Sequence, residues 1–179
     1  MQMEGKHMGK TLIIYYSRRG ENYVNGSIVN LEKGNTEIVA EYLKEATGGD
    51  LFEIRTVKEY DKDYTRCTEE AKTELRENTR PELREYLDSV EEYDNIIVAS
   101  PCWWGTVVPG MFTQLEKLNF TGKKVFSVMT HEGSGLGKSV EDLKRTCKGA
   151  NVGKGLAIHG ADAKKSKQAV TDWVKKNIG

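Results

Sequence analysis

The chain has 179 residues, and its 27 Lys and Arg residues balance 27 Asp and Glu residues, so the formal net charge is zero. This length suits one domain with a full hydrophobic core. A nucleic-acid-binding protein would show a basic excess, and no apolar run approaches the roughly 20 residues that a membrane-spanning helix needs. The sequence therefore predicts a soluble, cytoplasmic protein that binds neither nucleic acid nor membrane.

The start of the chain and the cysteines narrow the class of protein further. Residues 1–9 contain three Met and one His before any pattern begins, and we interpret them as a start-site or cloning remnant. Residues 10–179 are expected to form a single domain. The cysteines Cys67, Cys102 and Cys147 are odd in number and widely spaced, which excludes a disulfide framework or a structural zinc site. No metal-binding motif is found.

Five short apolar runs predict five β-strands. The first, Thr11–Tyr16, is almost continuously apolar, as a strand buried on both faces requires. The second, Leu51–Arg55, alternates and is typical of a strand nearer an edge. The remaining three runs are Asn95–Ser100, Lys124–Met129 and Lys154–Ile158.

Helical spacing of apolar residues fills most of the gaps between these runs. The first helix is expected from Thr36 to about Ala46, with Asn35 as its N-cap and Gly48 at its end. Three more are marked by Met111, Leu115 and Leu118 after Pro109, by Val140, Leu143 and Cys147, and by Val170, Trp173, Val174 and Ile178 with Asp162 as a candidate cap. Strands separated by helices favour parallel βαβ units. We expect a three-layer αβα domain with an open, doubly wound, five-stranded parallel sheet.

One crossover, residues 56–93, is longer than the others. Its first part predicts a charged helix over about Thr68–Thr79, whose glutamates we interpret as a solvated face. Pro81 follows, and then a second apolar set that includes Leu83 and Val90.

Ligands of open parallel sheets bind outside the carboxyl ends of the strands, and this rule nominates three loops. The first loop, Ser17–Gly34, far exceeds the usual 2–6 residues. Its ends place hydroxyl, amide and cationic side chains beside a helix N-terminus: Ser17, Arg18, Arg19, Asn35 and Thr36. Such a terminus binds anions, most often phosphate. The alternative is a disordered surface insertion with solvated arginines.

The second loop, Pro101–Thr106, contains two consecutive tryptophans directly after a strand. An indole that stacks on a flat heterocycle gains roughly 0.5–1.5 kcal/mol beyond area burial, so Trp103 and Trp104 are candidate ligand contacts. The alternative is that at least one of them belongs to the core or to an interface. Cys102 is better explained as a small buried thiol than as a nucleophile.

The third loop, Thr130–Ser139, is rich in glycine and ends in Gly-Lys-Ser. A nucleotide-binding P-loop would need Gly where this chain has Glu132, so we reject an NTPase. A backbone of this kind can approach a planar ligand closely. His131 is either a proton donor or a bystander.

These loops, in this order, resemble the flavodoxin family from about Lys10 to the end of the chain. The segments that carry the resemblance are YYSRRGENY with GNTEIVAEYL, SPCWWGTVVPGMFTQLE, and THEGSGLGKS. In this comparison the chain is similar to a branch with a long insertion in the phosphate loop. The resemblance implies a sheet of order 2-1-3-4-5 and a non-covalently bound FMN.

The resemblance also implies a set of cofactor-binding residues. The phosphate would be held by Ser17, Arg18, Asn35 and Thr36. The apolar face of the ring would be bordered by Pro101, Trp103, Trp104 and Gly105, and its other edge by His131, Glu132, Gly133 and Gly135. No catalytic residue is assigned.

Three functions are compatible with such a site. The first is electron transfer between protein partners, and the second is a small FMN-dependent NAD(P)H:quinone-type oxidoreductase. The third is a non-enzymatic binding module. Electron carriers usually have an acidic excess that steers partners, which this chain lacks, although the Glu-rich helix of the long crossover could supply a local acidic patch.

Overall fold

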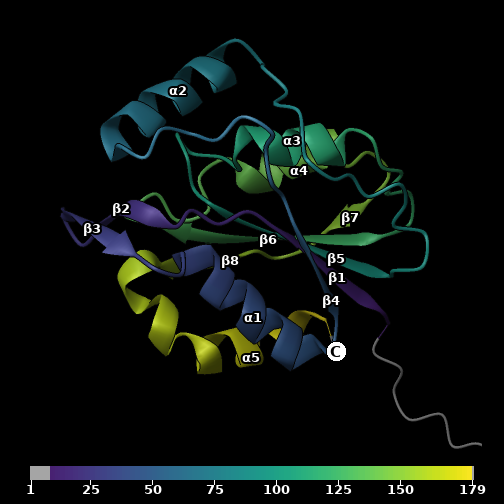
Figure 1. Ribbon diagram of the computed structural model, residues 1–179. Helices are drawn as coiled ribbons and strands as arrows, with labels where there is room; N and C mark the ends of the chain where they lie inside the picture. Colours follow the sequence, from purple (N-terminus) through teal and green to yellow (C-terminus); the bar gives the residue numbers. More distant parts are fainter. Residues whose placement is uncertain (1–8, 179) are drawn as a thin grey trace, which may run out of the picture.

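A parallel sheet lies between two layers of helices in the computed structural model, which describes residues 9–178 (Figure 1). Residues 1–8, most of the predicted N-terminal remnant, lie outside the described part. The sheet contains β1 (Thr11–Tyr15), β4 (Asp50–Glu53), β5 (Asn95–Pro101), β6 (Lys124–His131), β7 (Asn151–Val152) and β8 (Leu156–His159). The order is β4-β1-β5-β6, with β7 and β8 both paired to β6, and every pairing is parallel. The predicted order 2-1-3-4-5 is therefore confirmed, with the fifth strand interrupted between β7 and β8.

The side chains of β1 divide the core into two halves, because successive residues of a strand point to opposite faces. Leu12 and Ile14 pack with Met111 and Leu143, on the face covered by α3 and α4. Ile13 packs with residues of α1 and α5 on the other face. The four helices span Pro109–Leu115 (α3), Ser139–Thr146 (α4), Asn35–Thr47 (α1) and Lys167–Asn177 (α5). Figure 1 shows α1 and α5 together on one side of the sheet and α3 and α4 on the other.

Two predicted helix caps are wrong. Asn35 is the first residue of α1, and Gly34 occupies the cap position without a side-chain hydrogen bond. Asp162 lies within a short 3-10 helix, Gly160–Lys165 (η1), so Ser166 precedes α5 instead. The C-terminal prediction for α1 is confirmed, since Gly48 adopts a left-handed conformation with φ of 69° and closes the helix onto the Lys44 carbonyl.

The long first loop folds into a β-hairpin, which excludes the alternative of a disordered insertion. β2 (Gly20–Val24) and β3 (Ser27–Leu31) pair antiparallel in a sheet of their own. Asn25 and Gly26 join them with φ of 54° and 87°. Positive φ at both central residues defines the type I′ turn, and Asn-Gly is its preferred sequence. The Asn-Gly pair between alternating apolar residues is thus a hairpin signal that our loop interpretation missed.

The charged helix of the long crossover begins earlier than expected. α2 spans Tyr64–Arg76, and the Asp63 side chain caps it by accepting a hydrogen bond from the Arg66 amide at 2.9 Å. The second apolar set is extended rather than helical, and Leu83 pairs with Thr56 in an isolated antiparallel bridge. In Figure 1, α2 lies beyond α3, in a layer of its own above the sheet.

Within residues 9–178, no helix has the length and apolar character needed to cross a membrane. The three cysteines are all free. The described part of the chain also contains no cluster of His, Cys, Asp or Glu side chains suited to a metal ion.

Replacement of Leu43 tests the α1 side of the core. Leu43 is fully buried among residues of β1 and α5, so Leu43→Ala should lower the free energy of unfolding by about 2–5 kcal/mol. Urea denaturation measures this loss. The matched control is the neighbouring Lys44→Ala, which lies on the exposed face and should change the free energy by less than about 0.5 kcal/mol. Equal effects of the two substitutions would contradict the packing described here.

Candidate functional site

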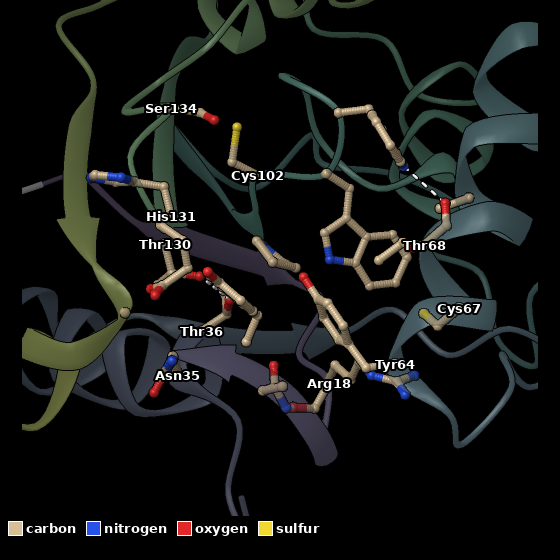
Figure 2. Close-up of a pocket in the computed structure, with 18 residues that line it drawn as sticks. Arg18, Asn35, Thr36, Tyr64, Cys67, Thr68, Cys102, Thr130, His131 and Ser134 are labelled. Carbon is tan, nitrogen blue, oxygen red and sulfur yellow. Dashed lines mark hydrogen bonds between the residues drawn. The ribbon is translucent and has the colours of Figure 1, made fainter. Parts of the chain in front are cut away.

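A cavity of about 330 Å³, here called the central cavity, opens at the carboxyl edge of the sheet. It lies where the strand order reverses. The chain passes from β1 to β4 on one side of β1, and then from β4 to β5 on the other side. This is the position at which open α/β sheets bind ligands. The walls come from the ends of β1, β5 and β6, from the start of α1, and from the hairpin and α2 (Figure 2).

The N-terminus of α1 is fixed against the end of β1 by a close backbone approach. The Ser17 hydroxyl accepts a hydrogen bond from the Glu37 amide at 3.0 Å. A Cβ at Gly34 would collide with the Ser17 hydroxyl and would lie 2.5 Å from the Arg18 carbonyl oxygen. Only glycine permits this contact. The first amides of α1, those of Asn35 and Thr36, have no intrahelical acceptor, as at any helix N-terminus, and both residues line the cavity.

Arg18 provides the positive charge at this end of the site. Its Nε donates to the Glu21 carbonyl at 2.8 Å. Its Nη2 donates to the carbonyls of Asp61 and Lys62 at 2.9 and 3.0 Å. The guanidinium therefore joins the hairpin to the segment that precedes α2. Because its partners are neutral carbonyls, the charge of Arg18 remains available to an anion.

A buried hydroxyl pair connects α1 to β6 across the floor of the cavity. The hydroxyls of Thr36 and Thr130 lie 2.8 Å apart, and both side chains are buried (Figure 2). Gly160 approaches from the other side, where an added Cβ would lie 2.5 Å from Oε2 of Glu132 and 2.9 Å from the side-chain Nδ2 of Asn35. The floor is thus polar and tightly packed.

The two tryptophans play different parts. Trp103 is partly buried, and its ring meets Tyr16 and Tyr60 edge to face, with centroids 5.4 and 5.1 Å apart. Trp104 is 51% exposed. Its Nε1 donates to the Thr68 carbonyl of α2 at 2.9 Å, and the Lys72 ammonium lies 5.1 Å from its ring centroid. Trp103 is therefore an aromatic wall, while Trp104 links its loop to α2.

The turn at Trp104 is strained, which is a feature of functional loops. Trp104 and Gly105 have φ of 53° and 84°, and Trp103 pairs with Thr106 across them. A left-handed conformation is uncommon for a bulky residue. The Gly105 carbonyl also accepts the Lys138 amide at 2.6 Å, so the second and third loops are held together.

One face of α2 forms the wall opposite the sheet. Tyr64, Cys67, Thr68 and Ala71 all line the cavity, and they recur at the helical spacing that defines one face. Cys67 and Ala71 are buried. This stripe was present in the sequence, but we placed the start of the helix at about Thr68, which left Tyr64 and Cys67 outside it, and interpreted only its glutamates, as a solvated face.

The hairpin closes the remaining side. The rings of Tyr23 and Tyr64 stack with centroids 6.1 Å apart. At the tip of the hairpin, the Asn25 amide donates to Oε1 of Glu132 at 2.6 Å. This contact joins the hairpin to the third loop, so the cavity is bounded by the hairpin as well as by the sheet and α2.

His131 ends β6 beside His159, with ring centroids 5.6 Å apart. The Gly133 amide donates to its Nδ1 at 2.9 Å, which assigns the proton of the neutral ring to Nε2. Burial, together with the neighbouring His159, lowers the pKa of His131, and Glu132 opposes this shift. His131 is therefore a neutral hydrogen-bond donor near pH 7.

The two thiols in the cavity are not activated. Burial raises the pKa of Cys67 to about 11. Burial also raises the pKa of Cys102, against an opposing hydrogen bond from Gly105. Both groups remain thiols at neutral pH, which is consistent with the prediction that Cys102 is not a nucleophile, but the Cys102 side chain is only partly buried and not fully buried as expected.

The structure brings most of the predicted site residues together. The cavity is lined by Arg18, Asn35, Thr36, Pro101, Trp103, Trp104, His131 and Glu132. Ser17 lies just outside it and acts on the α1 terminus, while Gly105, Gly133 and Gly135 do not line it. The lining residues that sequence reasoning missed are Asn22, Tyr23, Tyr64, Cys67, Thr68, Ala71, Cys102, Thr130, Ser134 and Gly160.

Several solved structures are similar to this chain. A protein from Bacteroides uniformis, described as a flavoprotein, is 29% identical with a TM-score of 0.72, over 93% of this chain and 98% of that one. A protein of the same description from Bacteroides eggerthii is 24% identical with a TM-score of 0.74, over 94% and 97%. A flavoprotein from Lactobacillus acidophilus in complex with FMN is 23% identical with a TM-score of 0.62, over 90% and 99%.

No functionally curated protein matches the chain. A family model does match it. The model described as flavodoxin matches residues 28–177, which include α1, all of the main sheet after β1, and the second and third loops. With the sheet order and the cavity at its switch point, this match shows that the chain belongs to the flavodoxin family.

Proposed function

We propose that this protein binds FMN non-covalently in the central cavity and uses it as an oxidoreductase of small molecules. The proposal rests on one observation: an anion-binding end and an aromatic wall line the same cavity. An anion-binding end, formed by Arg18 and the start of α1, faces the same space as the aromatic wall of Trp103. A phosphate attached to a flat heterocycle matches both ends. The similar flavoprotein from L. acidophilus was solved in complex with FMN.

The chemistry of most of the predicted donor set is compatible with FMN. The phosphate would be held by Arg18, Asn35 and Thr36, through the free amides of α1 and one guanidinium, with Ser17 fixing the start of the helix. The ring would be bordered by Pro101, Trp103 and Trp104 on one side and by His131 and Glu132 on the other, whereas the predicted Gly105, Gly133 and Gly135 do not line the cavity. Bound FMN supplies the capacity to accept and donate one or two electrons.

The chain's own residues would orient and shield this cofactor. His131 offers Nε2–H as a neutral donor, because its Nδ1 already accepts the Gly133 amide. The hairpin and α2 limit the entry of water through the contacts of Tyr23 with Tyr64 and of Asn25 with Glu132. The thiols of Cys67 and Cys102 are protonated and leave the wall of the cavity uncharged.

Two features favour small-molecule substrates, such as a nicotinamide donor and a quinone acceptor, over a redox protein. A carrier exposes its cofactor to a docked partner, whereas this cavity is fenced by α2 and the hairpin. The fully exposed charge of α2 and its caps, where the Glu-rich sequence could have supplied an acidic patch, is balanced. Its exposed charged residues over 63–77 are three cations and three anions: Arg66, Lys72, Arg76, Asp63, Glu69 and Glu77. We propose a cytoplasmic location, in which the three free cysteines would remain reduced.

Titration with FMN tests cofactor binding. The protein should bind FMN and quench its fluorescence. Trp103→Ala should weaken binding by roughly tenfold through loss of the aromatic wall, and Trp104→Ala should weaken it less, because that indole is directed to Thr68 and Lys72. Trp103→Phe keeps an aromatic ring at this position and should therefore bind FMN more tightly than Trp103→Ala. Absence of FMN binding would exclude the redox functions, and equal, negligible effects would show that both indoles are structural.

Anaerobic reduction separates the two redox functions. The FMN-loaded protein should be reduced directly by NADH or NADPH and reoxidised by a soluble quinone, since the cavity admits small molecules. The flavin absorbance records both steps. A protein that stays oxidised until a reduced flavoprotein or ferredoxin-like partner is added would instead be an electron carrier.

The His131 environment predicts a pH dependence. Its pKa is lowered in the folded chain relative to the ordinary value of 6.5, so the unfolded chain binds the proton more readily. The stability associated with neutral His131 is present above about pH 6.5 and is lost as the pH falls through the lowered pKa. Titration of the imidazole by NMR should give a midpoint below 6.5. A midpoint at or above 6.5 would contradict the buried, neutral assignment.

A further inference from the structure

A second cavity of about 590 Å³, here called the lateral cavity, lies beside the central one at the same carboxyl edge of the sheet. It is formed between the ends of β1 and β4, the base of the hairpin, and the start of the long crossover. The lining residues are Tyr16–Glu21, Asn30, Glu53–Thr56, Glu59, Tyr60, Lys62 and Arg84. None of the predicted ring-binding residues is among them.

The two cavities share a wall. Arg18 lines both of them. Tyr16 and Tyr60 line the lateral cavity, and their rings contact Trp103 of the central cavity at centroid distances of 5.4 and 5.1 Å. A ligand in the lateral cavity would therefore lie next to a ligand in the central cavity, separated by one layer of side chains.

The lateral cavity carries an excess of positive charge. Its five cations are Arg18, Arg19, Arg55, Lys62 and Arg84, against the three acids Glu21, Glu53 and Glu59. Three of the arginines form ion pairs, with Glu37, Glu53 and Glu59. All three guanidinium groups are exposed, and ion pairs of exposed groups are weak enough to be exchanged for a stronger anion.

Neither of the remaining two cations of the lateral cavity forms an ion pair within the described part of the chain. Arg18 donates to neutral carbonyls, and one of these belongs to Lys62. Within residues 9–178, the Lys62 ammonium forms no ion pair or side-chain hydrogen bond, and Lys62 is exposed. Because Arg18 is assigned to the FMN phosphate, Lys62 is the cation of this rim that a second phosphate would engage first.

The aromatic side of the lateral cavity is uncharged. The Tyr60 hydroxyl donates to Glu74 on α2. Burial and this hydrogen bond raise the pKa of Tyr60, and burial raises the pKa of Tyr16, so both phenols remain neutral at physiological pH. The cavity therefore combines ring surface with a cationic rim, and no phenolate opposes a bound anion.

We propose that the lateral cavity binds the nucleoside diphosphate part of the nicotinamide dinucleotide that reduces this protein. The proposal rests on the proposed function and adds the location of the electron donor. The cationic rim would hold the two phosphates through charge-assisted hydrogen bonds, and the Tyr16 and Tyr60 side would pack against a base. The nicotinamide end would extend past Arg18, which lines both cavities, into the central cavity, where it would contact the flavin ring directly.

Calorimetric titration of the FMN-loaded protein with ADP, NADPH and inorganic pyrophosphate tests this assignment. The double substitution Lys62→Gln with Arg55→Gln removes two rim cations without touching the residues assigned to FMN. It should weaken the binding of ADP and of NADPH by at least about tenfold. Lys148→Gln is the matched control, because it removes an exposed cation near the amino end of β6, and it should change the affinity by less than about twofold. The FMN affinity of all variants should stay unchanged.

The outcomes separate this inference from the proposed function. If FMN binds but ADP does not, or if the double variant binds ADP like the unsubstituted protein, the lateral site is wrong and the flavin site stands. If pyrophosphate binds as tightly as ADP, the rings contribute nothing and the nucleotide assignment is overturned. The same titrations on the FMN-free protein test the lateral cavity even if FMN binding itself fails.

Discussion

The parallel pairing of β1 with β5, and of β5 with β6, determines where every functional group of this protein lies. The register places Tyr15 beside Ala99 and Pro101 beside Thr130, so the three strands end along one edge. Three loops that are distant in the sequence then begin side by side. The helix that follows β1 is fixed there by the Ser17 hydroxyl and by the close approach of Gly34. The anion-binding terminus of α1 and the aromatic loop after β5 are neighbours because the strands that precede them end side by side.

Two elements outside the main sheet limit access to the central cavity. The β2–β3 hairpin and α2 both contact the cavity from outside the main sheet, and Arg18 connects them through the carbonyls of Glu21, Asp61 and Lys62. Their stacking through Tyr23 and Tyr64 encloses the central cavity. The base of the hairpin and the segment that precedes α2 also line the lateral cavity. Enclosure beside a cationic cavity is the feature that supports the proposed use of small, charged donors, since electron carriers dock their partners through an open acidic surface.

Sequence patterns predicted the elements that depend on local or periodic signals. The five strands, the main helices and the flavodoxin order follow from apolar spacing and from the three loops. The N-cap of α1 was predicted wrongly at Asn35, because the capping oxygen comes from Ser17, a residue distant in the chain. The hairpin signal at Asn25 and Gly26 and the stripe from Tyr64 to Ala71 were present but outweighed by loop length and charge. Contacts such as Asn25 with Glu132 depend on tertiary packing alone, and no local pattern encodes them.

FMN is proposed to occupy the central cavity with its phosphate at the start of α1. Backbone amide shifts, recorded by NMR during titration with FMN, locate the bound cofactor. The largest changes should fall on residues 17–18, 34–37 and 101–105, with further changes at 131–135, while the opposite edge of the sheet around Lys123 and Gly149 should stay unchanged. Shifts that are absent, or that are centred away from the α1 terminus, would contradict it.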